Sequence, residues 1–334
     1  MKKLTITMAV LDILAIICFI LFYAVKDFKY TLIATAMNTK THQWVAYTFY
    51  SEEEVNRVLA ADSYIPINED VKLDDIVIDT KEKDSYDNEY DEQVLTRDGN
   101  NEDYKLINIK VGGYNAYLVA IYDPSKVRLV HADKFNVGGN PEKNRLIYMC
   151  PDNGAKVCIN GGMFVDYGTG SDIPMGYLIK DGKVIWSDHN GAGNLIGFNY
   201  DGKLMLVTAT GEEAIKMGIR DALEFGPFLI VNGKTIQFNG SVGGYSRAAR
   251  VAIGQRRDGV VLFLVTDGTH AAGPNMGEVT DTLKKYGAYN AANLDGGTSS
   301  TLVINGKLIN NPKNIYGQRL TLGRKIVSGF GLVP

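Results

Sequence analysis

The stretch "ANLDGGTSSTLVING", from Ala292 to Gly306, combines signals for a fold and for a site. An apolar run ends in Asp295, two glycines and three hydroxyl residues follow, and a strand-like run then leads into Asn-Gly. Asn-Gly after a β-like run is typical of a tight hairpin turn. A turn at Asp295 would need only one glycine after the acid. The second glycine and the hydroxyl cluster therefore favour a functional loop at the end of a strand.

The same hairpin texture extends over residues 104–334. Short β-like runs alternate with Asp-Gly or Asn-Gly pairs, which begin at positions 181, 201, 232, 258 and 305. Helical patterns are found near 212–224 and near 276–286. The segment shows no strand–helix–strand alternation. It predicts one α+β domain with hairpin-rich mixed or antiparallel sheets and a few packed helices.

The N-terminal residues predict a membrane anchor, with residues 1–25 forming a cytoplasmic tip and a transmembrane helix. A basic Met-Lys-Lys is followed by a nearly continuous apolar run over residues 4–25, interrupted by Asp12. This run has about the length that a helix needs to cross a bilayer, and it is longer than the core of a cleaved signal peptide. The basic tip favours a single-pass cell-membrane protein with its N-terminus inside and its C-terminal domain extracellular.

Residues 26–80 are expected to form a mostly helical stalk, with Ser51 as a helix cap and Glu54 reaching back to it. Residues 81–103 are rich in acids and lack periodicity, which indicates an acidic linker or mobile loop.

Composition restricts the possible partners and cofactors. The 334 residues carry a net charge of −3, which gives no reason to expect nucleic acid as a partner. Cys18 lies in the apolar run, whereas Cys150 and Cys158 can form a disulfide or remain two separate thiols. No metal-ligand spacing is present, so no cofactor is expected; the need for a divalent cation and the oligomeric state stay open.

Four segments place polar residues at the ends of predicted strands. Three are "VCINGGMF" (157–164), "FLVTDGTH" (263–270) and "ANLDGGTSS" (292–300), and "SRAARVAIG" (246–254) puts Arg250 just before a strand. Arg250 can bind a phosphate or carboxylate, and glycine amides after Asp295 can approach an anion closely. Two acids, Asp267 and Asp295, form the kind of pair that glycosidic cleavage commonly requires.

These motifs resemble the phosphodiester glycosidase family. The similar runs are "INGGMF", "GPFLIVNGK", "RVAIGQ", "LFLVTDG" and "NLDGGTSSTLVINGK", in the family's order, over residues 104–334. The family usually has a third glycine where this chain has Thr298, and a threonine where this chain has Val251.

The resemblance implies hydrolysis of the bond between a sugar's anomeric carbon and a phosphate oxygen. Its implied catalytic residues are Asp295, Asp267 and Arg250. The implied substrate-binding residues are Asn160, Gly161, Gly162, Gly268, His270, Gly296, Gly297, Ser299 and Ser300.

The expected partner is a phosphorylated glycan of a cell surface or exopolysaccharide. Asp295 would act as base or stabiliser at the anomeric carbon, and Asp267 as second acid or sugar ligand. A non-catalytic module binding sugar phosphates or wall polymers, and a glycosyl transferase, remain alternatives. The sequence leaves open the sugar, the aglycone and the stereochemical outcome.

Overall fold

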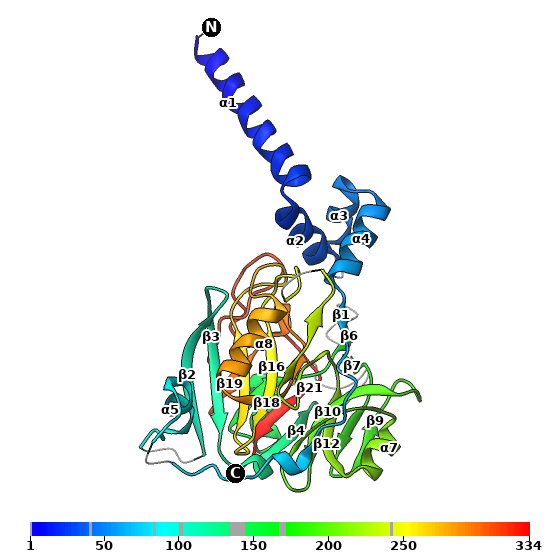
Figure 1. Cartoon of the computed structure of the whole chain (residues 1–334), viewed down its shortest axis with the longest axis vertical. Coiled ribbons are helices and arrows are strands. Elements are labelled where there is room, and N and C mark those ends of the chain that lie inside the picture. The colour runs from blue at the N-terminus through cyan, green and yellow to red at the C-terminus, as the bar shows by residue number, and fades with distance from the viewer. Residues whose placement is uncertain are drawn as a thin grey trace.

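The computed structural model describes residues 2–39, 42–82, 85–99, 103–133, 144–166, 172–240 and 243–334. Figure 1 shows a long N-terminal helix that projects from a group of short helices, which sit on one end of a β-rich body. The helices are α1 (Lys2–Phe19), α2 (Lys26–Met37), α3 (Gln43–Phe49), α4 (Glu52–Asp62), α5 (Glu89–Leu95), α6 (Leu146–Asp152), α7 (Gly211–Lys216) and α8 (Met276–Lys285).

The largest sheet has seven strands and holds the centre of the body. In order across the sheet they are β14 (Lys234–Thr235), β13 (Phe228–Val231), β18 (Ala288–Leu294), β16 (Val251–Arg256), β17 (Val261–Thr266), β3 (Tyr114–Ile121) and β2 (Tyr104–Val111). Neighbouring strands whose registers are defined pair antiparallel. The predicted α+β class with antiparallel hairpins is confirmed.

Two five-stranded sheets and two short ribbons complete the β structure of the described residues. One sheet runs β11 (Leu204–Ala209), β10 (Gly193–Asn199), β12 (Ile219–Glu224), β8 (Leu178–Lys180) and β9 (Lys183–Trp186). The other runs β20 (Lys307–Leu308), β19 (Leu302–Ile304), β5 (Val157–Asn160), β21 (Ser328–Leu332) and β4 (Val127–His131). The ribbons are β1 (Tyr64–Ile65) with β15 (Gln237–Phe238), and β6 (Phe164–Asp166) with β7 (Asp172–Pro174).

Both faces of the seven-stranded sheet are buried. Side chains of one parity, such as Ile253 and Phe263, enter the core shared with the five-stranded sheets. Those of the other parity, such as Ala252 and Leu262, join Val279 and Leu283 of α8 in a second core. Alternate residues of a strand point to opposite faces, so a strand buried on both sides is apolar throughout. This explains the apolar run of β17 and the apolar first half of β16.

Helices α2 to α4 pack on one another as a small helical cap, residues 26–62. Their shared core contains Ile33, Ala46, Val55 and Val58. Ser51 caps α4 as predicted by accepting a hydrogen bond from the Glu54 amide at 3.3 Å. The Glu54 carboxylate does not reach back to the cap, because it pairs with Lys29 of α2 at 2.5 Å. This ion pair ties α4 to α2.

One helix prediction is confirmed and another needs correction. Helix α8 occupies the predicted 276–286 region with an Asn275 capping box. The segment 212–224 is not one helix, because α7 ends at Lys216 and the chain then enters strand β12. Gly218 adopts a φ of +98°, a conformation that ends helices, and the following residues pair with β10 and β8. Burial between two strands outweighs the helical pattern there.

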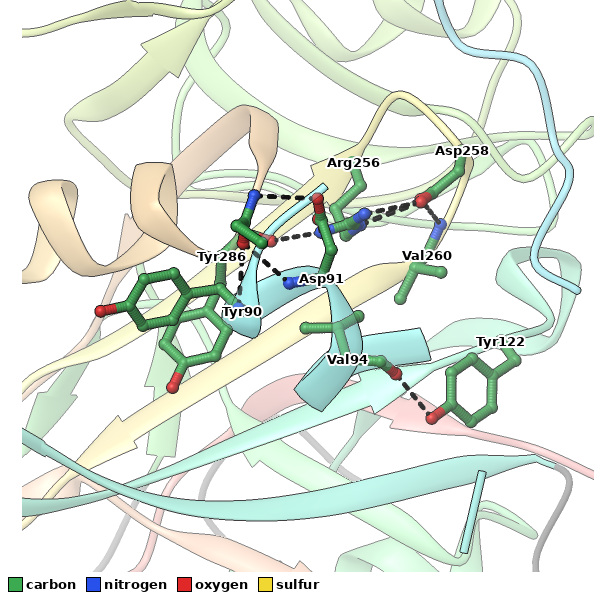
Figure 2. Close-up of polar contacts among 9 residues, drawn as sticks. Tyr90, Asp91, Val94, Tyr122, Arg256, Asp258, Val260 and Tyr286 are labelled. Atoms are coloured by element: carbon green, nitrogen blue, oxygen red, sulfur yellow. Dashed lines mark hydrogen bonds and ion pairs between the residues drawn. The ribbon is translucent and has the colours of Figure 1, made fainter. Parts of the chain in front are cut away.

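The acidic stretch contains helix α5, which packs on the domain. Val94 and Leu95 are fully buried beside the seven-stranded sheet. Figure 2 shows Arg256 of β16 reaching Asp91 of α5 at 2.8 Å, the Asp258 carboxylate at 2.8 Å and the Tyr286 carbonyl. The stretch that we interpreted as a linker or mobile loop thus contributes an ordered element to the core.

The Cys150–Cys158 pair, which the sequence left open, forms a disulfide that joins α6 to β5. Both cysteines are fully buried in a small core with Leu146 and Val303.

Candidate active site

The antiparallel order of three central strands brings the predicted motifs to one edge of the sheet. Strand β16 lies between β18 and β17, with Val251 opposite both Leu294 and Val265. The start of β16 therefore lies beside the ends of its two neighbours. Arg250, which precedes β16, is placed between the loop that begins at Asp295 and the loop that begins at Asp267.

The Asp295 loop is fixed from both sides by backbone and amide contacts. The Asp295 amide donates to the Gly161 carbonyl at 2.8 Å, and the Asn160 side chain donates to the Asp295 carbonyl at 2.6 Å. Asn160 also accepts from the Thr301 amide at 2.9 Å, so one buried side chain spans the loop. A Cβ on Gly161 would lie 2.3 Å from Leu223 and 3.0 Å from the Gly329 Cα. Asn160 and Gly161 thus position Asp295 from behind.

The two glycine amides after Asp295 have different roles. Gly297 has a φ of +58° and donates its amide to the Ala249 carbonyl at 2.7 Å, so this amide is committed within the protein. Within the described part of the chain, no acceptor is found for the Gly296 amide. A Cβ on Gly296 would lie 2.5 Å from the Ala249 carbonyl oxygen. Of the expected pair of anion-binding amides, Gly296 alone remains for a ligand.

Arg250 is held at the cleft by its own neighbourhood. Its Nη2 donates to the Ser246 carbonyl at 2.9 Å, and its backbone amide donates to the Thr266 hydroxyl at 2.8 Å. Burial lowers the pKa of Arg250 to about 10, and the charge of Asp62 opposes this effect. The guanidinium therefore stays positive at neutral pH. In the described residues no acceptor is found for Nη1, which leaves this nitrogen for an anionic ligand.

A cleft of about 880 Å³ lies over these loops. Its walls include Arg250, His270 and Asp295 to Thr298, as the motifs predict. It is also lined by residues that sequence reasoning missed. These are Asn38, Thr39, Asp62, Ser63 and Tyr64 of the cap and its exit, together with Asn293 and Arg324. No motif marks them, because their contribution depends on how distant segments pack.

Arg324 is a second guanidinium at the cleft. Its Nη1 donates to the Ser299 hydroxyl at 3.4 Å, and its guanidinium lies 4.9 Å from the Phe164 ring centroid. The cleft is therefore lined by two guanidinium groups, whereas the sequence predicted only that of Arg250.

Several predicted residues support the site without lining the cleft. The Asp267 carboxylate accepts from the Asn311 amide at 2.7 Å and from the Tyr117 hydroxyl at 3.4 Å, so it anchors neighbouring segments. Gly268 has a φ of +153°, and a Cβ there would lie 2.4 Å from the Ala272 carbonyl. Its role is to shape the loop that carries His270.

Three further predicted residues, Gly162, Ser299 and Ser300, are buried behind the cleft. The Gly162 amide donates to the Ser328 hydroxyl at 3.1 Å. Ser299 accepts from Arg324, and the Ser300 hydroxyl is buried with no partner among the described residues. These serines therefore lie beneath the loop, and their hydroxyls do not line the cleft.

His270 faces a histidine of the cap. The His42 and His270 ring centroids are 5.0 Å apart, and the His270 Cα would lie 3.4 Å from a Cβ on Gly297. Burial, and then the charge of His42, lower the pKa of His270. His270 is consequently neutral at physiological pH and connects the Asp295 loop to the cap.

The two departures from the family pattern have different consequences. Val251 is fully buried in the core between sheets, away from the cleft. Thr298 lines the cleft beside Gly297. Only the change at Thr298 alters the surface available to a ligand.

The motifs that form this site are found in a known protein family. A model of the phosphodiester glycosidase family matches residues 153–333, which include Arg250, Asp267 and Asp295. The chain belongs to the phosphodiester glycosidase family.

Among curated relatives, mouse N-acetylglucosamine-1-phosphodiester alpha-N-acetylglucosaminidase is 26% identical over 217 residues, covering 59% of this chain and 41% of that protein. The bovine enzyme of the same name is 43% identical over 68 residues, covering 20% of this chain and 13% of its own. The chain thus matches less than half the length of these relatives.

Among solved structures, the zebrafish enzyme's catalytic domain, auto-inhibited by its pro-peptide, aligns with a TM-score of 0.56. The alignment has 22% identity and covers 70% of this chain and 82% of that one, which supports the fold assignment.

Proposed function

We propose that this family member hydrolyses a sugar 1-phosphodiester, cleaving the bond between the anomeric carbon and the phosphate oxygen. The observation that carries the proposal is the convergence of Asp295, Arg250 and the Gly296 amide at one cleft. Water supplies the new hydroxyl of the sugar, and the phosphate departs as a monoester that keeps the bonding electrons. Asp295 beside a positively charged anion-binding site suits this reaction, because a phosphate is a good leaving group.

Each side chain has a role that follows from its position. Arg250 and Arg324 bind the non-bridging phosphate oxygens, with the Gly296 amide as a further donor. Asp295 activates the water or stabilises the positive charge that develops at the sugar. Asp267 keeps the neighbouring loops in place through Asn311 and Tyr117. In this assignment Asp267 is a positioning residue and does not act as the second catalytic acid.

The proposed location is the outer face of a cell membrane. Among the described residues, one helical segment, Ile6–Ala24, is long and apolar enough to cross a bilayer, with a mean hydropathy of 2.6. The basic N-terminus favours an inside orientation for that end. The substrate is then a phosphodiester-linked glycan of the cell surface or an exopolysaccharide.

The deciding experiment uses the full-length protein in detergent with a methyl phosphodiester of N-acetylglucosamine 1-phosphate. Release of free sugar supports hydrolysis, and a new conjugate in the presence of an acceptor indicates the transferase alternative. Unchanged substrate that nevertheless binds indicates a binding module.

Asp295→Asn is expected to reduce turnover by at least about a thousandfold, because the amide cannot act as a base or carry negative charge. Its unfolding temperature should match that of the wild type. The control is Asp281→Asn, the same change on the exposed face of α8, which should leave turnover unaffected. Turnover near the wild-type rate in Asp295→Asn would remove Asp295 from the mechanism.

A further inference from the structure

The cleft is lined by two parts of the chain, and the family model matches only one of them. The family model begins at residue 153, and the groups assigned to bond cleavage all follow it. Further lining residues come from the helical cap and its exit, namely Asn38, Thr39, Asp62 and Tyr64. The shared region thus supplies the reaction chemistry, whereas the cap supplies a surface outside the family match.

The cap is docked rigidly enough to form part of a binding site. The Arg247 amide donates to the Thr35 hydroxyl at 3.1 Å, and the Gly240 amide donates to the Ala61 carbonyl at 2.9 Å. A Cβ on Gly240 would lie 2.6 Å from the Ala61 Cβ, so the two backbones are in close contact there. Tyr30 of α2 packs edge-on against Tyr245 at 5.1 Å. These contacts span both ends of the cap.

The cap wall has the chemistry that recognises a sugar. Asn38 is exposed at the C-terminal end of α2 and donates its amide to the Ser246 hydroxyl. No donor for the Asn38 carbonyl oxygen is found among the described residues, so this oxygen is available to a ligand hydroxyl. Tyr64 and Phe238, paired across β1 and β15, line the same cleft. Apolar walls with a few placed polar groups are typical of small-molecule sites.

Asp62 places a carboxyl group of the cap close to Arg250. Its carboxylate accepts from the Tyr245 amide, and it lies near enough to Arg250 for their charges to interact. Arg250 and Asn38 share one partner, because the Arg250 Nη2 donates to the Ser246 hydroxyl at 3.2 Å and the Asn38 amide donates to the same oxygen. A group bound by Asn38 therefore lies next to a phosphate bound by Arg250, as the sugar of a sugar 1-phosphate does.

We propose that the helical cap forms the sugar-recognition wall of the cleft, and that Asn38 selects the sugar by accepting a hydrogen bond from one of its hydroxyl or amide groups. The inference rests on the proposed phosphodiester site and adds the residue that determines its specificity.

The test measures kinetics of full-length protein in detergent on methyl phosphodiesters of N-acetylglucosamine 1-phosphate and of glucose 1-phosphate. Asn38→Ala is expected to raise KM for the preferred sugar by up to about tenfold, the effect of losing one ligand hydrogen bond. The kcat should change by less than about threefold, because Asn38 does not act on the bond that breaks. The preference between the two sugars should shrink.

A matched variant separates recognition from cap docking. Asn239→Ala removes a 2.6 Å contact with the Ser63 hydroxyl at the cap exit, and Asn239 does not line the cleft. It should leave KM and sugar preference unchanged. If Asn239→Ala reproduces the effect of Asn38→Ala, the effect comes from docking and the inference fails. It also fails if Asn38→Ala leaves KM unchanged, or increases kcat/KM, which would identify the cap as an obstruction.

Calorimetry with N-acetylglucosamine 1-phosphate distinguishes this inference from the proposed function. Wild-type binding that weakens about tenfold in Asn38→Ala, without any sugar release, would sustain the cap as a recognition wall and overturn hydrolysis. Hydrolysis with unchanged Asn38→Ala kinetics would sustain the function and overturn the cap's role. Absence of both binding and hydrolysis would overturn both.

Discussion

At the residue scale, the pair of His42 and His270 links the cap to the Asp295 loop. Burial and the nearby His42 both disfavour a proton on His270, so its pKa is lower in the folded protein than in the unfolded chain. The unfolded chain therefore binds this proton more tightly. His270 contributes a loss of stability as the pH falls through the unfolded pKa of about 6.5 toward the lower folded value.

His42→Ala should raise the pKa of His270, because it removes the repelling imidazole and some burial. Titration of the histidine ring protons by NMR measures this directly. His131 also has a pKa lowered by burial, but the charges that act on it are those of Lys180 and Asp133, so its titration should not move in His42→Ala. An unchanged or lower His270 pKa in His42→Ala would contradict the contact.

The sequence could predict which residues converge on the site, but it could not predict which way each side chain points. Arg250 and Asp295 share the cleft because antiparallel pairing places a strand start beside a strand end. Asp267 occupies the equivalent position on β17, yet its carboxylate accepts from Tyr117 and Asn311. Those partners come from segments with no local signal in the Asp267 motif.

At the element scale, local turn chemistry was sufficient for the hairpins. Asp181, Asn232 and Asn305 have positive φ values of 51°, 53° and 49°, as tight Asx-Gly turns require. Elements whose formation depends on distant partners were not predictable. Strand β12 forms because it pairs with β10 on one side and β8 on the other. Helix α5 forms because its Asp91 pairs with Arg256 and it packs on the sheet.

Helix α5 should detach when its ion pair with the sheet is weakened. Asp91→Asn removes the charge that faces Arg256, and hydrogen bonds to charged groups contribute about 1.5–3 kcal/mol. Hydrogen exchange followed by mass spectrometry should show faster exchange over residues 89–95, with the central strands unchanged. Glu92→Gln, a similar change at an exposed neighbouring position, is the control and should leave exchange unaltered. Equal acceleration throughout the domain would show that α5 does not open as a local unit.

At the scale of the whole molecule, the cap connects the apolar helix to the cleft. Helix α2 begins two residues after Ala24 and its 12 residues extend about 18 Å, so the cap sets the distance between the apolar helix and the cleft. Helix α3 contacts the C-terminal end of the apolar helix. The ring centroids of Phe22 and Phe49 are 4.8 Å apart, and the Tyr23 hydroxyl donates to the Phe49 carbonyl at 3.3 Å. Figure 1 shows this junction between α1 and the body.

The exposed aromatic side chains of α3 should rest in the membrane interface. Trp44 and Tyr47 are 63% and 49% exposed, and such amphipathic rings favour the headgroup region of a bilayer. The chain has two tryptophans, so Trp186→Phe leaves Trp44 as the single reporter. After reconstitution of this variant into phosphatidylcholine vesicles, brominated lipids should quench Trp44 fluorescence. In Trp44→Phe, the remaining Trp186, whose indole donates to the Pro174 carbonyl within the body, should escape quenching. Quenching of Trp186 without quenching of Trp44 would place a different face of the molecule on the membrane, and the cap would then not set the position of the cleft relative to the bilayer.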